Sequence, residues 1–122
     1  MHRILVIDDE ETIRDIFRQM LEMEGFEVAE APDGREGMML QRKRPADLVI
    51  TDLIMPDKEG LETIKELREE FPQVKISAVS GGGWMDAESY LLTAKRIGAN
   101  RALAKPVGRK TLLASVRELL NS

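Results

Sequence analysis

Three aspartates, one serine and one lysine are the residues of this sequence whose types and spacing suggest chemistry. Asp8 and Asp9 come at the end of one short apolar run, and Asp52 ends another. Ser80 and Lys105 end two further runs of the same kind. Three carboxylates brought to one place repel one another, and Lys105 is the one cation that the pattern places among them. A second source of positive charge is therefore required.

A divalent metal ion would supply that charge. Together with the Lys105 ammonium, a doubly charged ion neutralises three carboxylates. Oxygen ligands favour Mg²⁺ or Mn²⁺ over zinc or copper, and the chain has no cysteine and a single histidine, His2. Mg²⁺ at an incomplete protein site keeps positions open for water or phosphate oxygens, and a carboxylate beside it can attack phosphorus directly. The predicted chemistry is phosphoryl transfer.

Apolar runs and helical periodicities alternate along the chain, and they predict five strands that are each followed by a helix. Strands are predicted at residues 3–8, 26–30, 47–52, 74–80 and 101–105. Helices are predicted over residues 13–21, 33–42, 61–67, 87–97 and 112–120, and in the first, third and fifth of these ranges apolar residues recur at helical spacing. Gly25 and Gly98 are predicted helix stops, and Asp33 with Glu36 resembles a capping box.

This alternation predicts an α/β fold, a five-stranded doubly wound parallel sheet with helices on both faces. In such sheets ligands bind outside the carboxyl ends of the strands, where the winding order reverses. If the strand order is 2-1-3-4-5, as in flavodoxin-like folds, the first and third strands are neighbours. Asp8, Asp9 and Asp52 then meet at one edge of the sheet. The second strand offers no comparable residue.

The composition limits what else the protein can be. With 122 residues, the chain is predicted to form one domain over residues 1–122. No apolar run approaches the roughly 20 residues that cross a bilayer, and no leader is recognisable, so a cytoplasmic protein is expected. The lack of cysteine and the single histidine exclude a disulfide framework, a zinc site and a Ser-His-Asp triad. A net charge of −4 gives nucleic acid no general reason to bind, and the basic residues 42–44 are interpreted as a helix end.

Taken together and in order, these motifs resemble the receiver domain of two-component response regulators, including chemotaxis receivers. The resemblance covers the chain from Arg3 to the last predicted helix. Each motif alone is weak, and the combination on successive strand ends is specific. Its parts are Asp8-Asp9, Asp52-Leu53-Ile54-Met55-Pro56 with Gly60 beyond, Ser80, and Lys105-Pro106.

The resemblance implies a role for each residue of the phosphoryl site. Asp52 would be the phosphoacceptor, which takes a phosphoryl group from the phosphohistidine of a histidine kinase. Lys105 would pair with a phosphoryl oxygen, and the Ser80 hydroxyl would move toward another after transfer. The Lys105-Pro106 bond is typically cis in this family, which turns the lysine into the pocket.

The resemblance also implies the ligands of a Mg²⁺ ion, for which Mn²⁺ can substitute. Asp9 would bind the metal directly and Asp8 through a coordinated water. Asp52 and the backbone carbonyl of Ile54 would complete the protein ligands. No other cofactor is expected.

The implied partners are a sensor histidine kinase or phosphotransfer protein, and a downstream protein or an output domain outside this chain. Movement of Ser80 and of the glycines that follow it would switch a surface formed by the fourth helix, the fifth strand and the fifth helix. A homodimer linked to phosphorylation occurs in similar domains. The expected protein is a signalling phosphoacceptor and not an enzyme, with self-phosphorylation and slow self-dephosphorylation as its only reactions. No direct binding of nucleic acid or membrane is expected.

Three positions bear on how the switch and its decay would work. The family usually has an aromatic residue three positions before the lysine, where this chain has Ala102, so the aromatic part of the relay is missing. The positions two after Asp52 and two after Ser80 are Ile54 and Gly82. Neither offers a polar side chain to attacking water, and slow loss of the phosphoryl group is predicted.

Other functions are weighed against the same residues. A phosphatase of the haloacid-dehalogenase type needs an acid/base carboxylate two residues beyond its nucleophile, where this chain has Ile54. A flavodoxin-like cofactor protein needs a phosphate-binding loop after the first strand, where Asp8 and Asp9 would repel phosphate. A degenerate interaction domain would not keep all five key side chains. Asp8 and Asp9 could also serve only as caps of the first helix.

Overall fold

Five strands and five helices alternate along the part of the chain that the structure describes, as the sequence predicts. The computed structural model describes residues 2–53, 60–81 and 87–121. The strands are β1 (Arg3–Ile7), β2 (Glu27–Ala31), β3 (Leu48–Asp52), β4 (Lys75–Ser80) and β5 (Arg101–Ala104). The helices are α1 (Glu11–Met23), α2 (Gly34–Lys43), α3 (Gly60–Glu70), α4 (Ala87–Ile97) and α5 (Arg109–Leu120).

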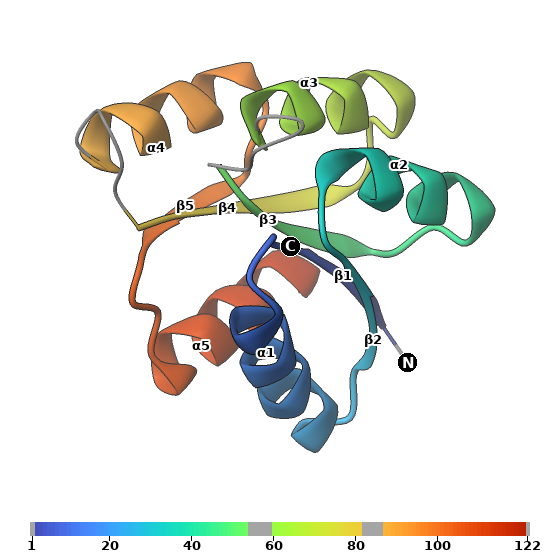
Figure 1. The fold of residues 1–122 in the computed structure, drawn as a ribbon, viewed down its shortest axis with the longest axis vertical. Coiled ribbons are helices and arrows are strands. Elements are labelled where there is room, and N and C mark those ends of the chain that lie inside the picture. The colour runs from blue at the N-terminus through green and yellow to red at the C-terminus, as the bar shows by residue number, and fades with distance from the viewer. Residues whose placement is uncertain (1, 54–59, 82–86, 122) are drawn as a thin grey trace.

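The strands form one parallel sheet in the order β2-β1-β3-β4-β5, which confirms the predicted doubly wound topology. Helices α1 and α5 cover one face, and α2, α3 and α4 cover the other (Figure 1). The winding reverses between β1 and β3, whose pairing places Ile7 opposite Thr51. The chain segments that follow these two strands are therefore neighbours at the carboxyl edge.

Strands β1 and β3 lie in the middle of the sheet because their side chains are apolar on both faces. All five residues of β3 and four of the five in β1 are buried. Leu5 and Ile7 pack with side chains of α2 and α3, whereas Ile4 and Val6 pack with side chains of α1 and α5. Apolar clusters on both faces of the sheet thus hold in place the two strands that lead to Asp8 and Asp52.

The ends of the helices follow the predicted signals. The Asp33 side chain accepts a hydrogen bond of 2.9 Å from the backbone amide of Glu36 at the start of α2. Gly25 and Gly98 follow α1 and α4 with φ angles of 91° and 136°, in the left-handed region that favours glycine. Arg42 and Lys43 occupy the last turn of α2, where cations stabilise the helix dipole.

Within the part of the chain that the structure describes, no helix has both the length and the apolar character needed to span a bilayer.

Arg68, near the end of α3, joins several segments at the edge of the sheet opposite the aspartates. Its guanidinium donates hydrogen bonds of 2.8 Å to the carbonyls of Pro72, Val74 and Gly98, and to the side-chain oxygen of Asn100. The same Asn100 oxygen accepts the amide of Ile76 in β4 at 2.8 Å. Partial burial lowers the pKa of the Arg68 guanidinium. No pattern in the sequence indicates this network.

Arg68→Met is expected to lower the free energy of unfolding by about 2–3 kcal/mol, because partly buried carbonyls lose their donors. Arg42→Met is the control. Arg42 donates to Glu70 at 2.9 Å, but both side chains are exposed, and such surface pairs contribute little to stability. Urea unfolding of the two variants measures the difference. Equal losses would show that the Arg68 network contributes no more than a surface ion pair.

Candidate phosphoryl and metal site

At the carboxyl edge of the sheet, the lysine that directly follows β5 joins two buried aspartates, one directly after β1 and one at the end of β3. The Lys105 ammonium donates a 3.0 Å hydrogen bond to Oδ2 of Asp8 and lies 3.5 Å from Oδ2 of Asp52. Asp8 is 3% exposed and Asp52 is 6% exposed. Buried carboxylates are costly unless they are paired, and one ammonium here serves both.

The surroundings of Lys105 favour its charged form. Burial by itself would lower the pKa of the ammonium. The hydrogen bond to Asp8 and the charges of Asp52, Asp8 and Glu10 act in the opposite direction, and the net result is a raised pKa. Lys105 therefore carries its charge throughout the neutral pH range.

Asp8 is held at several atoms. Its backbone amide donates to the carbonyl of Ala31 in β2 at 3.1 Å, and Oδ1 accepts the amide of Glu10 at 2.9 Å. The N-cap of α1 is Glu10, and this residue makes no side-chain cap hydrogen bond. A helix cap therefore does not explain the aspartate pair, because the Asp8 carboxylate also contacts Lys105.

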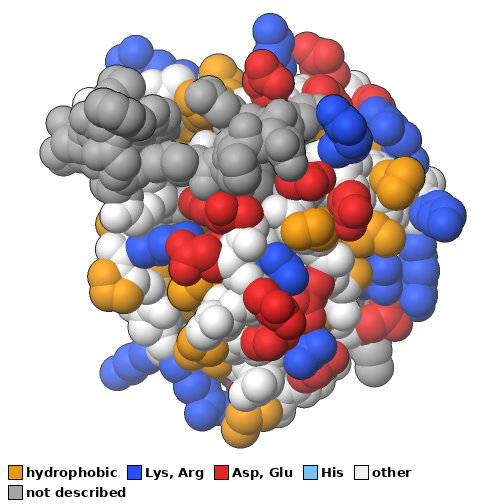
Figure 2. Space-filling model, in the orientation of Figure 1, with side chains coloured by type: hydrophobic (Ala, Val, Ile, Leu, Met, Phe, Trp, Pro, Cys, Tyr) orange, Lys and Arg blue, Asp and Glu red, His pale blue; other side chains and the backbone are white. Residues whose placement is uncertain are grey.

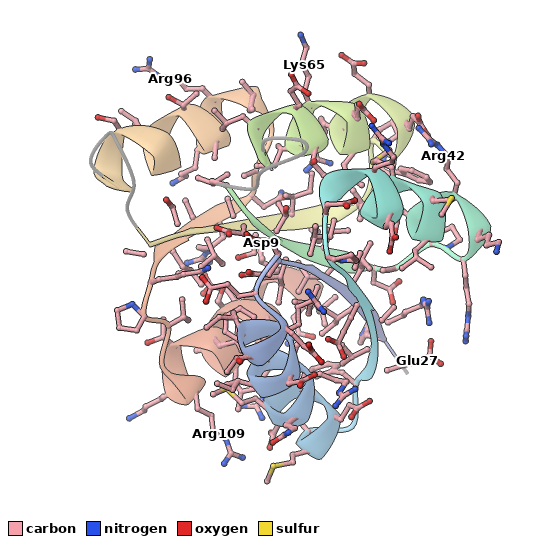
Figure 3. The ribbon with its side chains drawn as sticks, viewed as in Figure 1. Asp9, Glu27, Arg42, Lys65, Arg96 and Arg109 are labelled. Carbon is pink, nitrogen blue, oxygen red and sulfur yellow. The ribbon has the colours of Figure 1, made fainter. Side chains whose placement is uncertain are left out.

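Asp8, Asp9 and Glu10 each place a carboxylate oxygen within 4.8 Å of the others. Asp8 is buried, whereas Asp9 and Glu10 are exposed. Figure 3 labels Asp9 at the end of β1, where the chain turns into α1. This all-oxygen donor set fits a hard divalent cation such as Mg²⁺. Glu10 is not among the site residues predicted from the sequence, although its place directly after the aspartate pair is a signal that could have indicated it.

A pocket of about 690 Å³ opens over these residues. Asp9, Asp52 and Lys105 all line it, so side chains from three strand ends share one space. Several acidic side chains gather near the middle of the face shown in Figure 2, and basic side chains lie mostly around its rim. The pocket also has an apolar wall that the sequence did not reveal, formed by Ile13, Ile16, Phe17, Pro106 and Val107.

Ser80 lies at the end of β4 beside this pocket. Its backbone carbonyl accepts the amide of Lys105 at 2.9 Å. The Ser80 side chain is fully buried, and within the described residues its hydroxyl has no hydrogen-bond partner. A Cβ at Gly81 would lie 3.0 Å from Cδ of Lys105, so the chain passes close to the lysine stem here. A buried hydroxyl without a partner is a group that a new acceptor oxygen would satisfy.

The remaining predicted positions fall into two groups. The Lys105-Pro106 bond is cis, as the family resemblance implies. Ala102 pairs with Ala78 in the sheet and is partly exposed. The proposed metal ligand Ile54, and Gly82 after Ser80, lie outside the described residues.

The topology and the site define a class of protein. A doubly wound parallel sheet with buried aspartates and a lysine at its switch point is a flavodoxin-like α/β fold with a candidate phosphoacceptor centre. The family model of the response regulator receiver domain matches residues 4–117, and the chain belongs to this family of two-component signal transduction proteins.

Some curated relatives are matched over nearly their whole length, and others over about half of it. The chemotaxis protein CheY of Bacillus subtilis (strain 168) is 31% identical over 121 residues, which are 98% of each chain. The transcriptional regulatory protein CpxR of Escherichia coli (strain K12) is 33% identical over 120 residues, which are 98% of this chain and 50% of CpxR. The chain spans about half the length of CpxR and of the other transcriptional regulators it matches.

Solved structures of receiver domains are similar along nearly the whole chain. A response regulator receiver domain protein from Clostridium thermocellum has a TM-score of 0.91 at 31% identity, covering 99% of this chain and 95% of its own. A CheY-like receiver domain protein from Methanospirillum hungatei JF-1 has a TM-score of 0.92 at 30% identity, covering 99% and 94%.

Proposed function

We propose that this chain is a phosphoacceptor that takes a phosphoryl group onto Asp52 in a Mg²⁺-dependent reaction. The donor is the phosphohistidine of a sensor histidine kinase or of a phosphotransfer protein. The observation that carries the proposal is the buried Asp52 carboxylate, 3.5 Å from Lys105 in a pocket that it shares with Asp9. A carboxylate poised beside a cation and open to a pocket is suited to nucleophilic attack.

The transfer balances without a further reactant. An Asp52 carboxylate oxygen forms a bond to phosphorus while the phosphorus–nitrogen bond of the donor histidine breaks, and the bonding electrons return to the imidazole nitrogen. Lys105 is placed to pair with one phosphoryl oxygen, since its ammonium already lies beside the attacking group.

Bound Mg²⁺ would supply the charge that lets an anionic phosphoryl group approach an acidic pocket. The proposed protein ligands are Asp8, Asp9, Asp52 and the backbone carbonyl of Ile54. Glu10 lies close enough to add an oxygen or a coordinated water. Mn²⁺ takes the same oxygen ligands and serves as a probe of the site.

After transfer, the unpartnered Ser80 hydroxyl moves toward a phosphoryl oxygen, and this movement changes the surface of α4, β5 and α5. This surface binds the downstream partner, which is either a separate protein or an output domain joined to the chain. Ala102 has no ring to reorient, so the backbone after Ser80 carries the change. The response takes place in the cytoplasm, without direct contact with nucleic acid or membrane.

The apolar wall of the pocket supports a protein donor over a small molecule. Ile16 on α1 is 42% exposed beside the site, and Pro106 and Val107 line the same pocket. An exposed apolar border on a charged pocket is typical of a surface that another protein covers. By contrast, Asp9 and Glu10 at the mouth disfavour a permanently bound phosphate cofactor such as FMN.

Incubation with acetyl phosphate and Mg²⁺ tests the proposal. We expect an intact-mass shift of one phosphoryl group that survives acid and is lost in base, as an acyl phosphate is. Omission of Mg²⁺ with EDTA should prevent labelling. Reduction of the adduct with borohydride converts an aspartyl phosphate to homoserine, and tandem mass spectrometry should find it at position 52. No adduct, or an adduct at another residue, would contradict the proposal.

A further inference from the structure

Arg14 connects the Asp8 backbone to β2. Arg14 is the fourth residue of α1, and its Nη1 donates a 2.8 Å hydrogen bond to the carbonyl oxygen of Asp8. Its Nε donates to Oε1 of Glu30 on β2 at 3.3 Å. The Arg14 side chain is 16% exposed and that of Glu30 is 20% exposed, so the pair is largely shielded from solvent. Because Glu30 on β2 pairs with Arg14, and Arg14 binds the Asp8 carbonyl, β2 contributes to the site indirectly.

We propose that Arg14 is a positioning residue for the metal site, which orients the Asp8-Asp9 peptide so that both carboxylates face one cation. This inference rests on the proposed function. The peptide unit is planar, so a hydrogen bond that fixes the Asp8 carbonyl also fixes the direction in which the chain enters Asp9. The Asp8 amide is already bound to Ala31, and Arg14 holds the opposite end of the residue.

Asp9 depends on this orientation more than Asp8 does. The Asp8 carboxylate is buried and is held by Lys105 and by the amide of Glu10. Asp9 is exposed, and its place follows from the backbone that leads into it. A metal site loses affinity when one ligand is free to turn away, since groups that orient ligands typically contribute a factor of about 10–100 in affinity.

The positive charge of Arg14 offers a competing explanation, which predicts the opposite change in metal affinity when Arg14 is replaced. A guanidinium near the site repels a divalent cation, so its removal by itself should tighten metal binding. Glu30 offsets that charge and also lies 3.0 Å from Arg18. Positioning therefore predicts weaker metal binding after loss of Arg14, whereas a purely electrostatic role predicts stronger binding.

Mn²⁺ titration of the whole chain decides whether metal affinity falls or rises when Arg14 is replaced. Free Mn²⁺ is followed by its electron paramagnetic resonance signal. Arg14→Met is expected to raise the Kd for Mn²⁺ about tenfold or more. Arg14→Lys, which keeps the charge and loses the forked donor, should also raise it. Arg18→Met is the matched control. It removes the same charge from the same Glu30 without touching Asp8, and its Kd should stay within about twofold of the native value.

An unchanged or lower Kd in Arg14→Met and Arg14→Lys would overturn the positioning role, as would an equal loss in Arg18→Met. Circular dichroism confirms that each variant is folded, and Arg14→Lys carries the test if Arg14→Met unfolds. If the native chain binds no Mn²⁺, the proposed function fails. Metal-free crystal structures of the native chain and Arg14→Lys then decide whether Arg14 orients the Asp8-Asp9 peptide, a contact that does not need a bound metal. A rotated Asp8-Asp9 peptide supports it, and an unchanged peptide overturns it.

Discussion

Asp52→Asn is expected to abolish the phosphoryl adduct formed with acetyl phosphate and Mg²⁺. An amide oxygen is a poor nucleophile, and the substitution also removes one negative charge from the proposed metal site. The fold should remain, because Lys105 keeps its 3.0 Å hydrogen bond to Asp8. Intact mass spectrometry after a fixed time measures labelling, and urea unfolding verifies that the variant is folded.

Asp47→Asn, at the other end of the same strand, provides the control. Asp47 directly precedes β3, at the opposite end from Asp52, and accepts the backbone amide of Arg3 at 2.8 Å. It is exposed and far from the carboxyl edge of the sheet. Asp47→Asn should label like the native chain. Labelling of Asp52→Asn at the native rate would place the acceptor elsewhere.

Gly60→Ala is expected to damage both the fold and the site. A Cβ at position 60 would lie 2.1 Å from the carbonyl oxygen of Asp52 and 2.5 Å from Cα of Leu53. Both are backbone atoms and cannot rotate away. The Gly60 amide also donates to the carbonyl of Leu53 at 3.0 Å, which holds the start of α3 against the end of β3. Relief of the clash must therefore move the start of α3 or the segment that carries Asp52.

The expected loss for Gly60→Ala is about 3 kcal/mol in the free energy of unfolding, at the upper end for an overpacked site. Labelling by acetyl phosphate should slow at temperatures where the variant is still folded. Gly108→Ala is the control, because a Cβ there meets no atom within 4 Å. It should cost about 1 kcal/mol or less and leave the labelling rate unchanged. Similar effects of the two substitutions would show that contact with the Asp52 backbone is not the cause.

Most of the fold was predictable from local patterns. Buried strands such as β3 read as uninterrupted apolar runs, and glycines such as Gly25 marked helix ends. Once the strand order was assumed, the convergence of Asp52 and Lys105 followed from the polarity of parallel strands. The sequence therefore predicted the elements and the approach of these side chains at one edge of the sheet.

The parts that could not be predicted depend on long side chains that reach between elements. Arg14 and Glu30 are 16 residues apart, and Arg68 and Asn100 are 32 apart. No periodicity reports such a pair, because each residue alone fits an ordinary charged or polar surface position. The apolar wall beside the site was hidden for a related reason, since Ile16 belongs to the same helical stripe as core residues.

The bridge from Lys105 to Asp8 and Asp52 has a consequence for biosynthesis. Strand β5 forms one edge of the sheet and pairs with β4, so the ammonium arrives with the last strand to be translated. A ribosome-bound chain that ends at β4 already contains both acidic groups but has no Lys105 to offset them. Completion of the sheet and neutralisation of its acidic centre are thus one event, which makes an intact centre a marker that all strands of the sheet are in place.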